Sequence, residues 1–430
     1  MSTKKFLIIV GGPTASGKTG FAIRLAQHFR TEIISLDSRQ FYEEMDIGTA
    51  KPSQEELASA PHHFVGHISI QQAYSVGDFV REALARLERL FGQYDILIAT
   101  GGSGLYIKSL CEGLDEFPDV PAEVKKSVSD LYEAEGITAL QTELERLDPD
   151  YFEEVDLQNP HRLMRAISVC RASGRPFSSF QTKGKVQRNF TPIFLQMHWP
   201  RRAQYDRINK RVDLMIEAGQ VAEARRLYPY RALTALQTVG YKELFSFIEG
   251  ESTLPESIDK IKRNSRRYAK RQLTWMRRDG YWKHFHPKEW EMALTYIGYS
   301  MDQAFKIVWA DEEQKEQCLS QMDGTSSLED PIEFLTAYQA DEVLASIPMI
   351  MYKKELLLLP EIMLTSTDEA QQQLLRHEAL NRSNDQTVYQ VVASKKPPTE
   401  EGSIKCSMDT LPGRLTKWVN DTQEIWKITN

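Results

Sequence analysis

The chain has 430 residues, 41% of them hydrophobic and 26% charged, with a formal net charge of −7. These values are typical of a soluble globular protein of about two or three domains. Cys111, Cys170, Cys318 and Cys406 lack C-x-x-C spacing, so they indicate neither a zinc site nor a disulfide framework. The apolar runs are only strand-sized, and the start of the chain leads directly into a strand. We therefore expect a cytoplasmic protein without a signal peptide or a membrane span.

The charge is unevenly distributed along the chain. Residues 288–430 contain 13 Lys and Arg against 24 Asp and Glu, a net charge of −11, whereas residues 1–287 have a net charge of +4. From Lys260 to Lys283 there are ten basic residues and one acidic residue, Asp279. Such a block is either a solvated helix face or an anion-binding surface. This asymmetry keeps a nucleic-acid partner possible despite the negative total.

The first motif is a phosphate-binding loop that follows the apolar run Phe6–Val10. The pattern G-x-x-x-x-G-K-[ST] requires a strand before it and a helix after it, and both are indicated here. Backbone N–H groups and the helix N-terminus would hold phosphate oxygens, with Lys18 as a cation and the Thr19 hydroxyl as a Mg²⁺ ligand. The alternative is a glycine-rich turn before an ordinary helix. The loop consists of Gly12, Pro13, Thr14, Ala15, Ser16, Gly17, Lys18 and Thr19.

Strands and helices alternate through the first half of the chain, which predicts an α/β fold with a parallel, P-loop NTPase-like sheet flanked by helices. Residues 112–186 contain helical patterns only and predict an α-helical insertion domain. A C-terminal α+β extension of unknown role follows at 288–430, with loops near 324–331 and 395–402. The predicted elements are strands 6–10, 32–36, 95–99 and 192–197, and helices 76–91, 124–135, 137–147, 160–172, 202–217, 221–227 and 257–278.

Two polar residues follow predicted strands at the edge where ligands bind in open parallel sheets. Asp37 could act as a general base or reach Mg²⁺ through water; alternatively, it only caps the turn that follows. Ser103 lies in a Gly-Gly-Ser-Gly turn and could hold a leaving pyrophosphate; alternatively, the turn is an ordinary connection. The strand 95–99 does not end in the Asp that many P-loop enzymes use to position Mg²⁺, which weakens an ATPase or kinase assignment.

Three basic clusters are candidates for binding phosphate. On the helix 257–278, basic residues recur three and four apart with Tyr268 and Trp275 between them, as in surfaces that hold single-stranded nucleic acid. A solvated basic helix gives the same pattern. Arg207 and Arg211 lie one helical turn apart and could reach a pyrophosphate. The cluster at 161–165 is, by itself, more typical of an ordinary surface.

Several separated motifs together resemble the tRNA dimethylallyltransferase (tRNA isopentenyltransferase) family, over about residues 6–285. The phosphate-binding loop alone is shared with many unrelated families, but the joint match of all the motifs in this order is highly specific. The motifs span residues 12–19, 37–42, 45–52, 73–75, 101–106, 159–166, 237–242 and 270–277.

The resemblance implies transfer of a dimethylallyl group from dimethylallyl diphosphate to N6 of the adenosine 3′ to the tRNA anticodon, with Mg²⁺ as cofactor. It implies that Asp37 accepts the N6 proton, that Lys18 and Arg211 bind the diphosphate, and that Ser103 replaces a threonine usual in the family. The residues implied to contact tRNA are Asp37, Ser38, Arg39, Gln40, His161, Arg162, Leu163, Met164, Arg165, Gln237, Thr238, Val239, Gly240, Tyr241, Lys242, Lys270, Arg271, Gln272, Leu273, Thr274, Trp275, Met276 and Arg277.

The sequence predicts a core formed by 1–111 and 187–287, a tRNA-contacting insertion at 112–186, and an extension whose net charge of −11 disfavours further tRNA contacts. We expect a monomer. Two alternatives stay open at this point: a P-loop kinase acting on a small metabolite, and a non-catalytic RNA-binding protein. Lys18, Thr19 and Asp37 argue against the second alternative.

Overall fold

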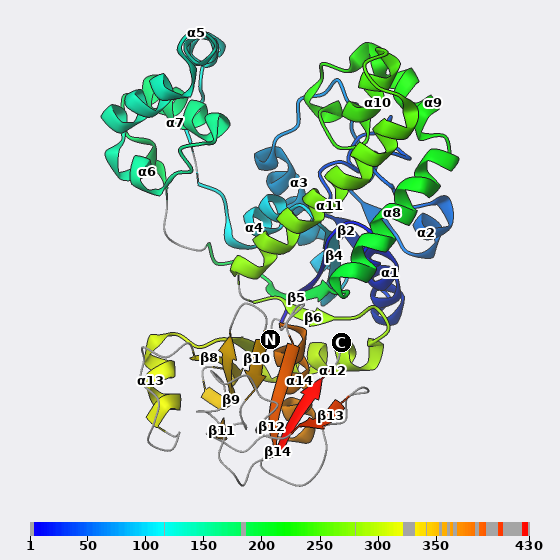
Figure 1. Ribbon diagram of the computed structural model, residues 1–430, viewed down its shortest axis with the longest axis vertical. Helices are drawn as coiled ribbons and strands as arrows, with labels where there is room; N and C mark the ends of the chain where they lie inside the picture. Colours follow the sequence, from blue (N-terminus) through cyan, green and yellow to red (C-terminus); the bar gives the residue numbers. More distant parts are fainter. Residues whose placement is uncertain are drawn as a thin grey trace. The chain divides into compact units, whose positions relative to one another are not determined.

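The structure is a computed structural model (Figure 1). It describes residues 4–115, 117–181, 186–279, 281–320, 332–340, 342–351, 355–358, 362–363, 368–382, 387–392, 403–406 and 424–428. By its contacts the chain divides into two compact units, one formed by Lys108–Arg188 and the other by the rest. Among the described residues, no helix has both the length and the apolar character that crossing a membrane requires.

A six-stranded parallel sheet forms the centre of the larger unit, in the order β3-β2-β4-β1-β5-β6. Every residue of β1 is buried, because helices cover both faces of the sheet and leave no polar face. The four predicted strands are present, whereas the short strands β3 and β6 carry no pattern long enough to predict them. The bounds are β1 Phe6–Gly11, β2 Ile33–Ser35, β3 His62–His63, β4 Ile96–Gly101, β5 Thr191–Met197 and β6 Lys283–Phe285.

The helices of this part begin and end largely where the sequence predicts. Helix α3, for example, begins after Ser75, which forms a capping box with Asp78, and buries Phe79, Ala83 and Leu87. The α/β prediction is therefore confirmed. The bounds are α1 Lys18–Phe29, α2 Gln54–Ser59, α3 Val76–Phe91, α4 Gly104–Glu112, α8 Arg201–Glu217, α9 Gln220–Leu227, α10 Tyr241–Ile248 and α11 Leu254–Asp279.

The unit Lys108–Arg188 is helical, as expected, and has its own hydrophobic core. Its main helices are α5 (Ala122–Leu147), α6 (Pro149–Glu154) and α7 (Pro160–Ser173). Within α5, Gly136 adopts φ 76° and ψ −167°, which interrupts the helix at the place where the sequence predicts a break between two helices. The proposed contact of this unit with tRNA stays a prediction.

The C-terminal extension contains a largely antiparallel sheet in the order β13-β14-β12-β10-β9-β8-β7, with β11 paired to β9. Among the strands that the structure describes here, β10 and β12 are the pair that runs in parallel. The predicted loops near 324–331 and 395–402 lie outside the described residues. The bounds are α12 Trp290–Gln303, β7 Phe305–Trp309, α13 Glu312–Ser320, β8 Ile332–Gln339, β9 Glu342–Met351, β10 Glu355–Leu358, β11 Ile362–Met363, α14 Glu369–Asn381, β12 Thr387–Val392, β13 Ser403–Cys406 and β14 Glu424–Ile428.

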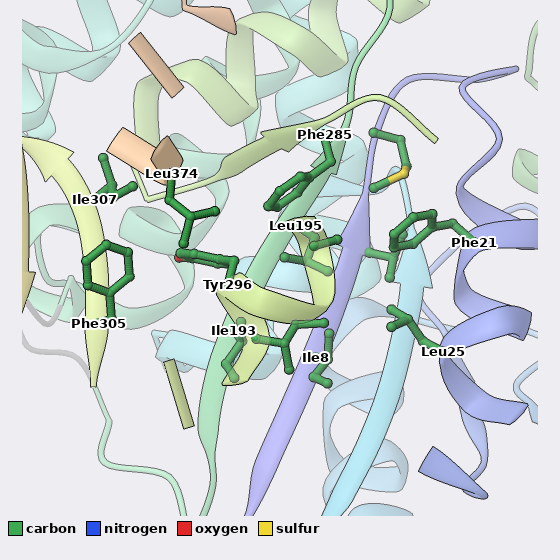
Figure 2. Close-up of a cluster of buried hydrophobic side chains, with 14 of the residues drawn as sticks. Ile8, Phe21, Leu25, Ile193, Leu195, Phe285, Tyr296, Phe305, Ile307 and Leu374 are labelled. Carbon is green, nitrogen blue, oxygen red and sulfur yellow. The ribbon is translucent and has the colours of Figure 1, made fainter. Parts of the chain in front are cut away.

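One hydrophobic cluster is shared by the parallel sheet and the extension. Ile8 and Leu195 from the parallel sheet, Tyr296 from α12 and Leu374 from α14 belong to the same set of buried side chains (Figure 2). Helix α12 packs against β5, and α14 packs against β6. The predicted three-part division stays a prediction, but the contacts group the extension with the core rather than as a separate unit.

Candidate active site

Three neighbouring strands deliver the predicted site residues to one edge of the parallel sheet. Strand β4 lies between β2 and β1, and Gly101 at its end pairs with Gly11 at the end of β1. The phosphate-binding loop follows β1, Asp37 follows β2, and Ser103 follows β4. Because parallel strands end at the same edge, these three segments meet there, as the sequence predicts.

The phosphate-binding loop is held in shape by side chains that bind its carbonyl groups. Trp199 Nε1 donates to Ser16 O (2.8 Å), Gln204 Nε2 to Thr14 O (2.7 Å) and Arg207 Nε to Ala15 O (2.8 Å). Ala15 adopts φ 63° and Gly17 φ 89°, both left-handed conformations that turn successive peptide groups. Thr14 N and Ser16 N donate within the protein, to Gln272 Oε1 and Pro13 O, so an anion would be bound by the N–H groups at the N-terminus of α1, which begins at Lys18.

The loop lies in a positively charged environment that also contains the Asp37 carboxylate. Burial lowers the pKa of Lys18 to about 8, the Asp37 carboxylate raises it in part, and the Arg211 guanidinium lowers it further. Burial also lowers the pKa of Arg211, and the charges of Asp37 and Glu56 oppose this shift. Lys18, Asp37 and Arg211 are therefore close enough to interact electrostatically. Two poorly solvated cations with one carboxylate form a site that an anionic ligand would stabilise.

Asp37 and Ser103 form one hydrogen-bonded turn. Asp37 Oδ1 accepts from Arg39 N (3.0 Å), so the turn-capping alternative is observed. No hydrogen bond to Asp37 Oδ2 occurs among the residues that the structure describes. Ser103 Oγ accepts from Ser38 N (3.1 Å) and lies 3.2 Å from Ser38 Oγ. Ser103 thus fixes the turn that carries Asp37, a role that its position after β4 did not indicate.

Helix α11 contacts the site with one face and solvent with the other. Gln272 accepts from Thr14 N (3.0 Å) and donates to Gly102 O (2.9 Å), which joins the phosphate-binding loop to the turn after β4. Burial, with the Asp37 charge, raises the pKa of Tyr268 to about 12. The basic side chains on the opposite face are exposed, namely Arg263, Arg267, Lys270, Arg271, Arg277 and Arg278.

The structure corrects several predicted tRNA contacts. Leu163 is buried in the core of its own unit, Met276 is 1% exposed, and Gln272 is occupied by the loop. These side chains support the structure rather than face a partner. Tyr241 is also fully buried. The predicted residues that remain exposed are His161, Arg162 and Arg165 on α7, with Gln237, Lys242, Lys270, Arg271, Thr274 and Arg277.

Two predicted residues use their side chains to organise nearby loops. Arg39 Nη1 donates to Ala235 O (3.1 Å), and Gln40 Nε2 donates to Ala50 O (2.9 Å). Both side chains are partly buried. The predicted segment 37–40 therefore has an internal structural function, and its contact with tRNA stays a prediction.

Glu223 is the structural residue that the sequence did not reveal. Its carboxylate accepts from the backbone N–H groups of Asp46, Ile47 and Gly48 at 2.8–3.0 Å and from Tyr241 Oη at 2.6 Å. It therefore fixes the segment 45–52, which the sequence singled out without a role. Glu223 lies alone on α9 with no motif around it, so only a three-dimensional structure could connect the two segments.

The donor set of the loop fits a Mg²⁺ ion that is held mainly by a ligand. Ser16 Oγ is buried and has no hydrogen-bond partner within the described part of the chain, and Thr19 places a second hydroxyl at the start of α1. Among the described residues, no group of three His, Cys, Asp or Glu side chains is arranged to hold a metal ion. Mg²⁺ commonly takes one or two protein oxygens, with phosphate oxygens and waters as the remaining ligands.

Comparison with known proteins identifies the family. The model of the family described as IPP transferase matches residues 40–279. A protein named tRNA dimethylallyltransferase from Christiangramia forsetii is 54% identical over 64% of this chain and 91% of its own length. Its namesake from Flavobacterium johnsoniae is 52% identical, with the same shares of each chain covered.

Solved structures agree with this match. The tRNA isopentenylpyrophosphate transferase of Bacillus halodurans has a TM-score of 0.52 and 31% identity, over 74% of this chain and all of its own. A eukaryotic dimethylallyltransferase acting on tRNA has a TM-score of 0.60 and 25% identity, over 70% of this chain and 79% of its own. Together with the site geometry, these matches show that the chain belongs to the IPP transferase family.

Proposed function

We propose that this protein transfers a dimethylallyl group from dimethylallyl diphosphate to N6 of the adenosine 3′ to the anticodon of tRNA. The proposal rests on one observation: the phosphate-binding loop with its Lys18 lies together with Arg211 and Asp37 at one edge of the sheet. Tyr268 of α11 lies beside them, and the other face of this helix is basic. Its relatives are named for this activity. A diphosphate site combined with a single carboxylate suits displacement of pyrophosphate by a weak nucleophile.

In the proposed reaction, N6 of adenine attacks C1 of the dimethylallyl group. The bond between C1 and the diphosphate oxygen breaks, a bond between N6 and C1 forms, and pyrophosphate leaves with the bonding electrons. Asp37 accepts the proton that N6 loses, so charge does not accumulate on the base. Lys18, Arg211 and the loop N–H groups stabilise the charge that develops on the departing pyrophosphate.

Mg²⁺ is the cofactor that we propose for this site, and Thr19 and Ser16 are the residues that would hold it. When bound, it would supply additional stabilisation of negative charge on the diphosphate. Ser103 positions Asp37 through Ser38, while Arg207, Gln204 and Trp199 keep the loop carbonyls away from the anion.

The partner of the exposed basic side chains is proposed to be the anticodon stem-loop of tRNA. Arg and Lys on α11 would neutralise backbone phosphates, a contribution that depends strongly on salt. The target adenosine must leave the base stack to reach Asp37, which costs a few kcal/mol. We further propose that the protein works as a monomer in the cytoplasm.

A transfer assay tests the proposal. The full chain, unmodified tRNA, Mg²⁺ and dimethylallyl diphosphate labelled in the prenyl group should yield labelled tRNA. A second arm offers ATP with a metabolite mixture and no tRNA; metabolite-dependent ATP consumption would favour the kinase alternative, which the Gly-Gly-Ser end of β4 disfavours. Folded protein that labels no tRNA would overturn the proposal.

A further inference from the structure

The C-terminal extension meets the catalytic core at β6, the last strand of the parallel sheet. The family match ends at residue 279, before this strand begins. Phe285 of β6 and Leu374 of α14 point into one buried cluster that also contains Leu195 of the neighbouring strand (Figure 2). The contact is therefore a continuous hydrophobic core and not a loose surface association.

A single buried carboxylate of the extension binds β6 through both main chain and side chains. Glu378 on α14 is fully buried; it accepts from His284 N (2.9 Å) and His284 Nδ1 (2.8 Å) and lies 3.1 Å from Lys283 Nζ. Arg382 Nε donates to the same carboxylate (2.7 Å), and Arg382 Nη2 donates to Trp282 O (3.4 Å). Glu378 and Arg382 thus fix three consecutive residues, 282–284.

The same segment also lies close to the phosphate-binding loop. A Cβ on Gly11, the last residue of β1 before the loop, would overlap the Trp282 ring, and one on Gly17 would lie 3.4 Å from Pro287. His286 stacks edge to face on Trp199 at 4.2 Å, and Trp199 in turn donates to Ser16 O. Residues 282–287 therefore support the loop directly before its first residue and at Gly17, and indirectly at Ser16.

From this arrangement we propose that the extension positions the diphosphate site, with Glu378 as the positioning residue that holds residues 282–287 against the phosphate-binding loop. The inference rests on the proposed function, because it assumes that the loop binds the diphosphate of the prenyl donor. Glu378 itself touches no substrate; it acts through Trp282, His286 and Pro287.

The physical argument concerns how accurately the loop is placed. Backbone N–H groups bind an anion well only when their directions are fixed, and a displacement of about 1 Å is enough to weaken such a site strongly. Segment 282–287 includes a three-residue strand at the sheet edge, which pairs with β5 alone among the described residues. Its position is therefore set largely by the carboxylate and core that the extension provides.

The test replaces Glu378 by Gln in the full chain. We expect the KM for dimethylallyl diphosphate, and the dissociation constant of inorganic pyrophosphate, to rise about tenfold. The kcat per folded molecule should also fall, because the loop N–H groups stabilise charge on the departing pyrophosphate, whereas the KM for tRNA should not change. Hydrogen–deuterium exchange should become faster at residues 11–18, since the loop opens more often.

The matched control is Ile350→Ala, a truncation in β9 of the same extension at a buried residue that lies outside the cluster shared with the parallel sheet. It should lower the melting temperature without changing the KM for the donor or loop exchange. Arg382→Gln serves as a milder second variant, because it removes one bond to Glu378 and the bond to Trp282. If Glu378→Gln does not fold, this variant decides the question by the same measurements.

Two outcomes would overturn the inference. One is that the glutamate variant, or Arg382→Gln in its place, changes the melting temperature but neither pyrophosphate binding nor exchange at 11–18. The other is that the control changes them equally. Pyrophosphate binding and exchange do not require transfer, so an inactive wild-type protein would contradict the proposed function and leave this inference testable by itself.

Discussion

Two lysines of this chain, Lys18 and Lys283, both have a pKa that desolvation lowers to about 8, yet they belong to opposite kinds of site. Lys283 is buried, whereas Lys18 is partly exposed. Lys283 lies 3.1 Å from Glu378 and donates to Leu374 O (2.8 Å). Lys18 has one weak donation, to Pro13 O at 3.4 Å, and interacts with Asp37 and Arg211. Lys283 therefore has its acceptors inside the protein, whereas Lys18 can still bind an acceptor on a ligand.

The carboxylates show the same contrast. Burial by itself raises the pKa of Glu378, but Lys283, His284 and Arg382 together hold it well below its ordinary value. Asp37 carries one hydrogen bond from its own turn. A buried charge whose partners are complete contributes to structure, and one whose partners are incomplete indicates a ligand site.

The largest expected effect comes from Lys18→Met. We expect kcat/KM for dimethylallyl diphosphate to fall by about 10²–10³-fold, because a donor to the leaving pyrophosphate is lost. The free energy of unfolding should not decrease, since a poorly solvated cation disappears. Initial rates and urea unfolding check the two expectations. A clear loss of stability would show that Lys18 is structural.

Lys283→Met is the counterpart in the other region. Breaking a buried ion pair on one side should lower the free energy of unfolding by about 3–5 kcal/mol. The kcat/KM for the donor per folded molecule should fall far less than in Lys18→Met, because Lys283 acts only through the segment that supports the loop. Urea unfolding and an active-site-normalised assay measure both quantities. A variant as stable as the wild type would remove the distinction between the two lysines.

Asp37→Ala should reduce kcat by about 10²-fold, because the proton acceptor is lost, with a much smaller change in tRNA affinity. Asp37→Asn is the control that can still accept the bond from Arg39 N but cannot take up a proton. Single-turnover rates and tRNA binding separate the two steps. Full activity in the Asn variant would reduce Asp37 to its turn-capping role.

The rate should depend on pH through Lys18. Its pKa of about 8 means that the free enzyme loses this charge as the pH rises through 8. We expect kcat/KM for the donor to fall by up to tenfold per pH unit above that value, and pyrophosphate binding at pH 8 to take up protons from the buffer. Lys18→Arg, which stays charged, should not show this alkaline decrease. An unchanged profile in that variant would assign the titration to another group.

The smallest effects distinguish the two faces of α11. Gln272→Ala should raise the KM for the donor about fivefold, since it leaves Thr14 N without its acceptor at a cost of about 1 kcal/mol. Lys270→Ala on the exposed face should instead weaken tRNA binding and reduce its salt dependence by about one unit of slope. If Gln272→Ala changed tRNA binding instead, or Lys270→Ala changed the KM for the donor, the roles given to the two faces of α11 would be wrong.

Much of the site follows from the sequence because its signals are local. The loop at 12–19 needs only its own glycines, lysine and threonine between a strand and a helix, and parallel strands bring Asp37 and Ser103 to the same edge. The family could also be predicted, because several separated motifs occur in the order that the family has. The roles of Gln272 and Leu163 could not be predicted, because the pattern of basic residues on a helix does not show which of its other residues face inward.

The sequence by itself determined the α/β core, the phosphate-binding loop and the family, since these depend on short-range patterns and on strand order. Only the tertiary structure showed how Glu223 fixes residues 46–48 and how Glu378 holds residues 282–284. Both carboxylates lie far along the chain from the groups they bind. Nothing in the local sequence distinguishes them from solvated glutamates, because their partners are set by packing between distant segments.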